Sequence, residues 1–236
     1  MLEIQAKLRE SQVATLTSTL FKRGLATRFF SGLSPLTPGK TRVVGEAFTI
    51  RAIPVREDIR AAVGKGGAPN LHRQAMAATR AGQIIVFDGN GCADVSPLGD
   101  IIALALRDKR VLGFVTDTGV NDLPAIGELG FPIWGKGPAG IPGAARIQVA
   151  DWNLPIGCAG VAVYPGDLIV ADETGAVCVP RDIAAEIADE AWEAEQLEIF
   201  LTAEIAAGAP LETTYPPDAE TRARYEIWRR ARVTPA

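Results

Sequence analysis

The feature that most constrains the fold is a unit of helix, strand and polar turn that occurs twice in succession. Residues 71–80 have the composition of a short helix and precede an apolar strand, residues 83–87, which ends in a turn rich in Gly and Asp. The same order returns within residues 96–129, where an apolar helix, a covered strand at residues 111–115 and a polar turn follow one another. Short apolar strands that alternate with helices predict parallel strands covered by helices. We therefore expect an α/β fold.

Polar residues lie at both ends of the second helix-strand unit. The backbone N–H groups after Asp100 are free at a helix N-terminus, where a carboxylate binds without a cationic side chain. Asp117, Asn121 and Asp122 follow the end of the strand, where open α/β sheets collect ligands. Carboxylates beside an anion site favour Mg²⁺ or Mn²⁺, which prefer oxygen ligands. A structural alternative stays open, because Asp100 and Asp122 are both well placed as helix N-caps, with Pro124 in the next first turn.

After residue 146, short strands separated by turns replace the helix-strand units. Strands are predicted at residues 147–150, 161–163, 168–170 and 176–179. Asp167 follows the turn pair Pro165-Gly166, and we interpret Asp167 and Asp172 as turn formers whose carboxylates accept backbone N–H groups. The chain therefore combines an α/β half with a β-rich half.

Three further helices are expected from apolar spacing. Residues 2–22 predict one helix, residues 181–207 predict a long helix with an acidic outer face, and residues 219–232 predict a basic amphipathic helix. We therefore divide the chain into a single α/β domain, residues 1–210, and a C-terminal helical tail, residues 211–236. The tail is expected to dock on the body or on a neighbouring subunit.

Composition excludes several classes of protein. A net charge of −4 and a pI near 5.2 argue against nucleic-acid binding, which needs a basic surface. Cys92, Cys158 and Cys178 form no CxxC pair, which fits reduced thiols in a cytoplasmic protein. No stretch resembles a signal peptide or a membrane span, so no membrane association is expected.

Common catalytic and nucleotide-binding motifs are missing from the sequence. His72 is the only histidine, which rules out a multi-histidine metal site, and no G-x-S-x-G motif supports a Ser-His-Asp triad. The glycine-rich residues 55–69 contain neither a phosphate-binding loop nor a dinucleotide-binding motif. We interpret this segment as a solvated loop.

Ordered motifs over residues 10–210 resemble the RraA-like family. They are Gly45-x-Ala47-x-Thr49, Gly99-Asp100, Gly113-x-x-x-Asp117-x-x-Val120-x-Asp122, Gly130-Phe131-Pro132 and Gly160-Val161-x-Val163-x-Pro165-Gly166-Asp167-x-Ile169-x-x-Asp172-x-x-Gly175-x-Val177-x-Val179-Pro180. This family includes class II aldolases that release pyruvate from 4-hydroxy-4-methyl-2-oxoglutarate and 4-carboxy-4-hydroxy-2-oxoadipate, and the regulator of ribonuclease E activity. The resemblance implies a swivelling β/β/α domain with flanking N- and C-terminal helices. It also implies a homotrimer or a hexamer (a dimer of trimers), with active sites between subunits.

The resemblance also implies roles for particular residues. In the aldolases a Gly-Asp helix start binds the pyruvyl carboxylate through backbone amides, and the matching positions here are Gly99, Asp100, Ile101 and Ile102. The Asp of the family's Arg-Asp pair binds Mg²⁺ or Mn²⁺, and Asp122 stands in its place. In the aldolases the Arg of that pair stabilises the enolate. Asn121 stands in its place here, and an Asn side chain has neither a permanent charge nor the two parallel N–H donors of a guanidinium. In the aldolases a Glu from the last long helix of a neighbouring subunit positions metal-bound water. Glu198 is the nearest match to that Glu by spacing.

Three functions stay open on this basis. The favoured one is a lyase that uses Mg²⁺, Mn²⁺ or Co²⁺ to cleave a small 2-oxo acid, by aldol cleavage that releases pyruvate or by oxaloacetate-type decarboxylation. In that reaction Asp100 moves a proton through water. The second is a different oxo-acid reaction marked by Asn121, and the third is a non-catalytic regulator that binds a ribonuclease. N-caps explain Asp100 and Asp122 singly but leave the ordered motifs around them unexplained, which favours the lyase.

Overall fold

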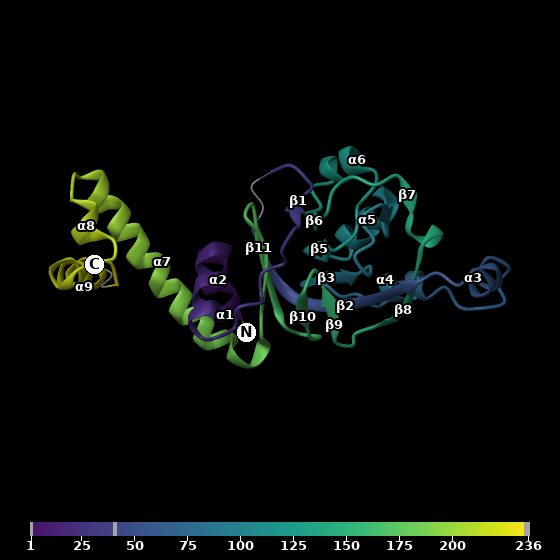
Figure 1. The fold of residues 1–236 in the computed structure, drawn as a ribbon, viewed down its shortest axis with the longest axis horizontal. Helices are drawn as coiled ribbons and strands as arrows, with labels where there is room; N and C mark the ends of the chain where they lie inside the picture. The colour runs from purple at the N-terminus through teal and green to yellow at the C-terminus, as the bar shows by residue number, and fades with distance from the viewer. Residues whose placement is uncertain (1, 40–41, 234–236) are drawn as a thin grey trace.

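The computed structural model describes residues 2–39 and 42–233, and these contain a main sheet of eight strands and two sheets of two strands each, with helices around the main sheet (Figure 1). The order of the main sheet is β1 (Ser34–Pro35), β6 (Ile133–Gly135), β5 (Gly113–Thr116), β3 (Gln83–Asp88), β2 (Val43–Pro54), β11 (Leu168–Asp172) and β12 (Gly175–Val179), and β8 (Ile147–Trp152) also pairs with β2. The strands β2, β3, β5 and β6 run parallel, whereas β1, β8, β11 and β12 pair antiparallel. The expected α/β fold is confirmed.

The long strand β2 joins the two halves of the chain. Its first residues pair with β11, and its last residues, from Ile50 to Pro54, pair with β8 with a register shift between Arg51 and Ala52. Along its other edge β2 pairs in parallel with β3. The strands β8, β11 and β12 of the β-rich half therefore belong to the same sheet as the parallel strands, because β2 carries partners from both halves.

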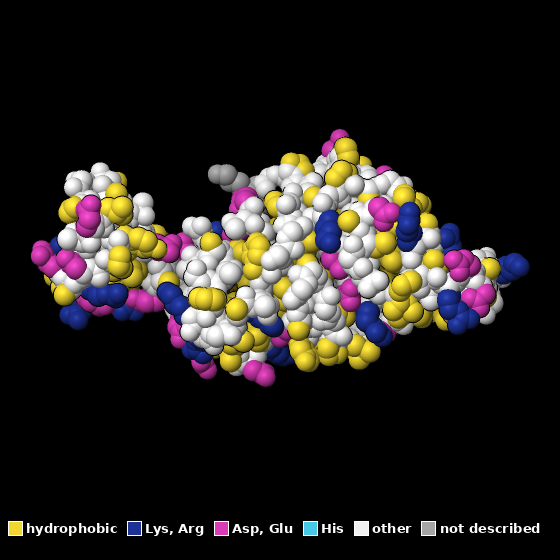
Figure 2. Space-filling view, in the orientation of Figure 1, with side chains coloured by type: hydrophobic (Ala, Val, Ile, Leu, Met, Phe, Trp, Pro, Cys, Tyr) yellow, Lys and Arg dark blue, Asp and Glu magenta, His cyan; other side chains and the backbone are white. Residues whose placement is uncertain are grey.

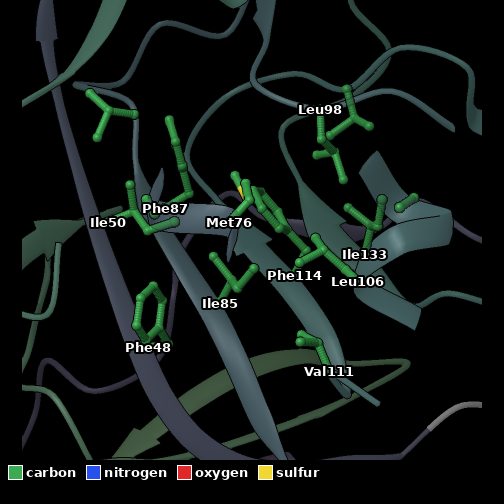
Figure 3. Close-up of a cluster of buried hydrophobic side chains, with 14 of the residues drawn as sticks. Phe48, Ile50, Met76, Ile85, Phe87, Leu98, Leu106, Val111, Phe114 and Ile133 are labelled. Atoms are coloured by element: carbon green, nitrogen blue, oxygen red, sulfur yellow. The ribbon is translucent and has the colours of Figure 1, made fainter. Parts of the chain in front are cut away.

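Helices cover the parallel part of the sheet and enclose its main core (Figure 3). These helices are α4 (Leu71–Ala78), α5 (Asp100–Asp108) and α6 (Leu123–Glu128). The rings of Phe87 and Phe114 stack with their centroids 5.9 Å apart, and Leu106 of α5 is buried in the same cluster. This packing anchors α5, so the start of α5 has a fixed place beside the ends of β3 and β5.

The predicted helix at residues 2–22 is divided into α1 (Leu2–Glu10) and α2 (Val13–Lys22), which corrects the expectation of one helix. Carboxylates from distant parts of the chain hold the start of α2. The backbone N of Val13 donates to Asp172 Oδ2 over 3.0 Å. Glu195 Oε2 accepts both the backbone N of Gln12, over 3.1 Å, and the hydroxyl of Thr15, over 2.9 Å. The local sequence predicts no break because its cause lies more than 150 residues away in the chain.

Replacing Glu195 by Ala is expected to destabilise the fold. Glu195 is only 6% exposed, and its loss leaves the buried hydroxyl of Thr15 and the partly buried backbone N of Gln12 without their acceptor. Leaving such donors unpaired lowers the free energy of unfolding by about 3 kcal/mol. Urea unfolding measures the change, with Glu190→Ala on the same helix as control, because Glu190 makes a surface ion pair with Arg23 that contributes little. Equal losses in the two variants would contradict this account of the α1–α2 break.

A long helix and two short ones extend away from the sheet at one end of the molecule (Figure 1). The helix α7 (Ala184–Ala206) follows a 3₁₀ turn, η2 (Arg181–Ile183), and packs on α1 and α2. Beyond it, α8 (Leu211–Thr214) and α9 (Ala219–Val233) fold back on α7. Phe200 of α7 meets Tyr225 and Trp228 of α9, with ring centroids 5.6 Å apart in each pair. Within the described residues the tail therefore docks on α7.

Several short elements were not predicted. They are α3 (Glu57–Gly64) in the segment expected to be a loop, β4 (Val95–Ser96), β7 (Ile141–Pro142), the 3₁₀ turn η1 (Gly143–Ala145) and β9 (Ile156–Cys158), besides β1, which opens the predicted connector at residues 34–40. The strand predicted at residues 161–163 is confirmed as β10 (Val161–Val163). Lys40 in that connector lies outside the described residues. The interpretation of Asp167 and Asp172 is confirmed. Asp167 accepts the backbone N of Tyr164, and Asp172 that of Thr174.

The surface carries charges of both signs. On the face drawn in Figure 2, Lys and Arg side chains are interspersed with Asp and Glu over the length of the molecule. No helix within residues 2–39 and 42–233 has both the length and the apolar composition needed to cross a membrane. All three cysteines are free, and Cys158 and Cys178 are buried.

Candidate functional site

The N-terminus of α5 lies against the residues that precede α6. Gly99 is the N-cap residue of α5 and has extended backbone angles, with φ −123° and ψ −171°. A Cβ atom at Gly99 would lie 2.6 Å from Asp122 Oδ2 and 3.3 Å from Asn121 Oδ1. A side chain at position 99 would therefore displace the Asp122 carboxylate, and the glycine lets that carboxylate lie close to the start of α5. The structure therefore brings Gly99, Asp100, Asn121 and Asp122 together.

The Asp122 carboxylate points to α5 and does not cap its own helix. Asp122 occupies the N-cap position of α6 in a left-handed conformation, with φ 51°, but makes no side-chain capping bond there. Its Oδ2 instead accepts the backbone N of Asp100 over a long 3.4 Å. A left-handed conformation is uncommon for a residue with a side chain and often marks a functional site. Asp122 therefore holds the N-cap position that the structural alternative predicts, but its carboxylate contacts α5 and makes no capping bond to α6.

Asp100 is also not an N-cap, because it is the first residue of α5. Its Oδ1 accepts the backbone N of Ile101 over 2.7 Å. Two exposed carboxylates therefore occupy the first amides of α5, and the partial positive charge of a helix N-terminus favours anions at this place. These amides are already used as an anion site by the protein's own side chains.

Ser96 positions Asn121. The Ser96 hydroxyl oxygen accepts the backbone N of Asn121 over 3.0 Å and lies 3.1 Å from Asn121 Oδ1. The same hydroxyl donates to the backbone O of Leu98 over 2.5 Å. Ser96 is buried in β4, so it ties the residue before Asp122 to the segment that leads into α5. Sequence reasoning did not single out Ser96, although it stands three residues before Gly99.

Two hollows meet at Asn121. The larger is a cavity of about 610 Å³, lined by Gly99 and Asn121 together with residues of α3, α4 and β8. The smaller, of about 470 Å³, is lined by Asn121, Asp122 and residues 138–140. A ligand on the α5 amides therefore has room on both sides, and Asn121 borders each of them.

His72 is a second residue that sequence reasoning set aside and the structure places near the site. It lies on α4, lines the larger cavity, and its Nε2 is 2.6 Å from the backbone O of Pro97. A carbonyl oxygen only accepts, so Nε2 carries a proton and donates. Burial lowers the pKa of the His72 imidazole, so the ring is neutral at neutral pH. No sequence motif indicates this contact, because the fold alone brings α4 to the segment before α5.

Asp117 and Glu198 do not join the site within one chain. Asp117 is 4% exposed and accepts the backbone N of Gly89 over 2.7 Å and that of Gly91 over 2.8 Å, which fixes the turn after β3. Glu198 lies on α7, at the other end of the molecule from α5 (Figure 1). Burial, with Glu195 nearby, raises the pKa of the Glu198 carboxyl. A role for Glu198 therefore requires a second chain and stays a prediction.

Comparison with known proteins assigns the chain to a family. The model of the RraA-like family, described as Aldolase/RraA, matches residues 13–178, which include every strand from β1 to β11 and the whole of the site. The chain belongs to the RraA-like family. The resemblance read from the ordered motifs is therefore confirmed.

Relatives of this RraA-like chain carry different names. A protein of Halalkalibacterium halodurans named "Putative 4-hydroxy-4-methyl-2-oxoglutarate aldolase" is 31% identical over 173 residues, 72% of this chain and 76% of that protein. Protein DlpA of Legionella pneumophila is 28% identical over 180 residues, 76% of this chain. The match spans only 28% of the length of DlpA. These names apply to the relatives.

Solved structures share the RraA-like fold. Streptomyces coelicolor RraAS2, described as an unusual member of the RNase ES inhibitor RraA protein family, superposes with a TM-score of 0.75 at 31% identity, over 84% of this chain and 94% of that one. An uncharacterized protein of Pseudomonas syringae superposes with a TM-score of 0.79 at 26% identity, over 91% of this chain and 98% of that one. Both cover most of the chain, so the RraA-like fold extends beyond the segment that the family model matches.

Proposed function

We propose that this RraA-like protein is a divalent-metal-dependent lyase that cleaves a carbon–carbon bond of a 2-oxo acid. The reaction is aldol cleavage that releases pyruvate, or decarboxylation of the oxaloacetate type. The observation that carries the proposal is the carboxylate of Asp122, which faces the first amides of α5 across the gap left by Gly99. The aldolase names of two relatives, from Halalkalibacterium halodurans and Deinococcus radiodurans, support the reaction class.

The donor groups at the site fit Mg²⁺ better than a metal that needs a full set of protein ligands. Within residues 2–39 and 42–233 no group of three or more His, Cys, Asp or Glu residues is arranged to hold a metal. Magnesium is usually bound by one or two carboxylates, keeps several waters and takes further oxygens from the substrate. Asp122 is the residue that would hold Mg²⁺, Mn²⁺ or Co²⁺, with Asp100 nearby. The bound ion supplies Lewis acidity toward the oxo-acid oxygens and the enolate.

The residues of this chain then have separate tasks. The backbone amides of Asp100, Ile101 and Ile102 bind the substrate carboxylate at the helix N-terminus. Because Asp100 Oδ1 occupies the Ile101 amide, the incoming carboxylate displaces the Asp100 side chain. Asp100 is then free to move a proton through water. Asn121, held by Ser96 at the border of the two hollows, orients the substrate with its amide group.

Pyruvate release tests the proposal. Purified protein is incubated with oxaloacetate and with a panel of 4-hydroxy-2-oxo acids in Mg²⁺, Mn²⁺ or Co²⁺, and pyruvate is followed with a coupled assay. We expect metal-dependent pyruvate formation that EDTA abolishes and added metal restores. The absence of turnover with all three metals across the panel would refute the lyase.

An Asn121→Arg variant is expected to release pyruvate from 4-hydroxy-2-oxo acids at least about tenfold faster, because a fixed cation beside a developing enolate lowers the barrier. The side chain at position 121 borders both hollows, so the longer Arg has room. Steady-state kcat/KM measures the change, with Asn121→Gln as the neutral control of similar polarity. A loss of activity in Asn121→Arg would favour the alternative in which Asn121 serves a different oxo-acid reaction.

We also propose a homotrimer or a dimer of trimers, in which Glu198 of one chain reaches the site of the next. Glu198 is exposed on α7, and in this assembly it lies beside the Asp122 of a second chain. Light scattering coupled to gel filtration gives the number of chains. A monomer with full activity would contradict both the assembly and the role of Glu198.

Regulation of a ribonuclease is the second candidate function. The likeness to RraAS2, whose description names an RNase ES inhibitor family, favours it. An assay of ribonuclease E-type cleavage with added protein, together with a pull-down, tests this function. A pull-down without any ribonuclease would dispose of it.

A further inference from the structure

We propose that the site takes a 2-oxo acid with a bulky apolar substituent, which lies in the 610 Å³ cavity beside Gly99 and Asn121. This inference rests on the proposed lyase function, because it assigns the part of the substrate beyond the oxo-acid end. Gly99, Ile102 and Asn121 of the candidate site also line the cavity, so the cavity adjoins the start of α5 where the oxo-acid end would bind.

The cavity is much larger than the oxo-acid end of a substrate needs. A water molecule takes about 30 Å³ in the liquid, so a cavity of this size has room for on the order of twenty non-hydrogen atoms. A pyruvyl unit contributes only six such atoms. Ligand cavities of this volume usually enclose a whole small molecule. The remaining volume therefore suits a substituent larger than a methyl group.

The walls of the cavity are mostly apolar, and α3, α4 and β8 supply much of them. Ile59 and Val63 belong to α3, Leu71 to α4, and Ile147 and Val149 to β8. Phe87 and Leu98, which Figure 3 shows in the main core, complete the inner wall. Burying an apolar group against such walls contributes about 25 cal/mol per Å² of apolar surface removed from water. The α3 segment, expected to be a solvated loop, thus forms one side of the cavity.

Charge makes the cavity a poor place for a second carboxylate. Among the described residues that line it, Arg60 alone is positively charged at neutral pH, since His72 is neutral and donates to Pro97. Arg60 is exposed and donates through one nitrogen to the backbone O of Ala144, so an ion pair between Arg60 and a carboxylate would be solvated and would contribute little. An unpaired carboxylate inside apolar walls is strongly unfavourable. The cavity therefore distinguishes an apolar substituent from a carboxylate.

Two oxo acids that differ in one group test this distinction. 2-Oxo-4-phenylbutanoate and 2-oxoglutarate share the chain of the oxo acid and carry a phenyl or a carboxylate at the same carbon. Titration calorimetry with Mg²⁺ gives their dissociation constants, and 2-oxobutanoate, which lacks the group, serves as the small reference. We expect the phenyl compound to bind at least tenfold more tightly than 2-oxoglutarate.

Filling the cavity is expected to remove that preference. Val63 is half-buried on α3, a helix without a fully buried residue, so Val63→Phe fills the cavity with little effect on folding. Ile59→Phe, one helical turn earlier on the same face, is the second variant. Both are expected to weaken binding of 2-oxo-4-phenylbutanoate at least tenfold and to leave 2-oxobutanoate unchanged.

The outcomes separate this inference from the lyase proposal. Equal or tighter binding of 2-oxoglutarate, no measurable binding of either compound, or unchanged phenyl binding in both folded variants would overturn it. If a variant changes only the number of chains measured by light scattering, the cavity is a contact surface for a second copy of the chain. That result would also overturn the inference. A clear phenyl preference without pyruvate release from any hydroxy-oxo acid would refute the lyase alone.

Discussion

Replacing Asp122 by Asn is expected to abolish metal-dependent turnover, with kcat/KM falling about a thousandfold or more. Asn retains the size and one oxygen of the carboxylate but loses the negative charge that a divalent ion requires. The Asp122 side chain makes no capping bond within α6, so the substitution does not remove a structural contact of that helix. Coupled pyruvate assays and metal titration by calorimetry measure the two effects.

The matched control for this prediction is Glu128→Gln. Glu128 is an exposed carboxylate at the other end of α6, so its loss removes the same charge from the same helix. We expect its turnover to match that of the unaltered chain. Retention of metal-dependent activity in Asp122→Asn, or an equal loss in Glu128→Gln, would show that the carboxylate at position 122 is not the metal ligand.

Replacing Gly99 by Ala is expected to lower kcat/KM about a hundredfold, because a small misplacement of reacting groups is enough for such a loss. The added methyl would lie 2.6 Å from Asp122 Oδ2, so the carboxylate has to move away from the start of α5. The backbone of Gly99 is extended, a conformation that Ala adopts without strain, so little change in the melting temperature is expected.

Gly157→Ala is the control for the Gly99 variant. A Cβ atom at Gly157, in β9, meets no atom within 4 Å, so activity and stability are expected to persist. Steady-state kinetics and thermal unfolding of both variants give the comparison. Full activity in Gly99→Ala would contradict the close approach of α5 and Asp122 as the basis of the site.

The parallel part of the fold was predictable because its signals are local. Apolar strands such as β3 and β5 alternate with helices along the sequence, and this order alone predicts parallel pairing. The division of the first helix was not predictable, because Glu195 and Asp172 cause it from the far side of the chain. Short strands such as β1 and β7 have only two residues each and leave no periodic pattern to detect.

The candidate site was likewise predictable only in part. Gly99, Asp100 and Asp122 lie at recognisable helix starts and belong to the family motifs, so the sequence indicated them. The direction of the Asp122 carboxylate was not predictable, because it depends on the left-handed backbone and on the missing side chain of Gly99. His72 and the apolar cavity also escaped prediction, since α3, α4 and β8 form the walls only in the folded chain.

The most direct test of the central claim is a crystal of the full chain soaked with Mn²⁺ and oxalate, a stable mimic of the enolate form of pyruvate. The proposed function predicts an anomalous peak in contact with the Asp122 carboxylate, and oxalate oxygens on the backbone amides of Asp100, Ile101 and Ile102. An Asp122 side chain still bonded to the Asp100 amide, with no anomalous peak beside it, would contradict the claim.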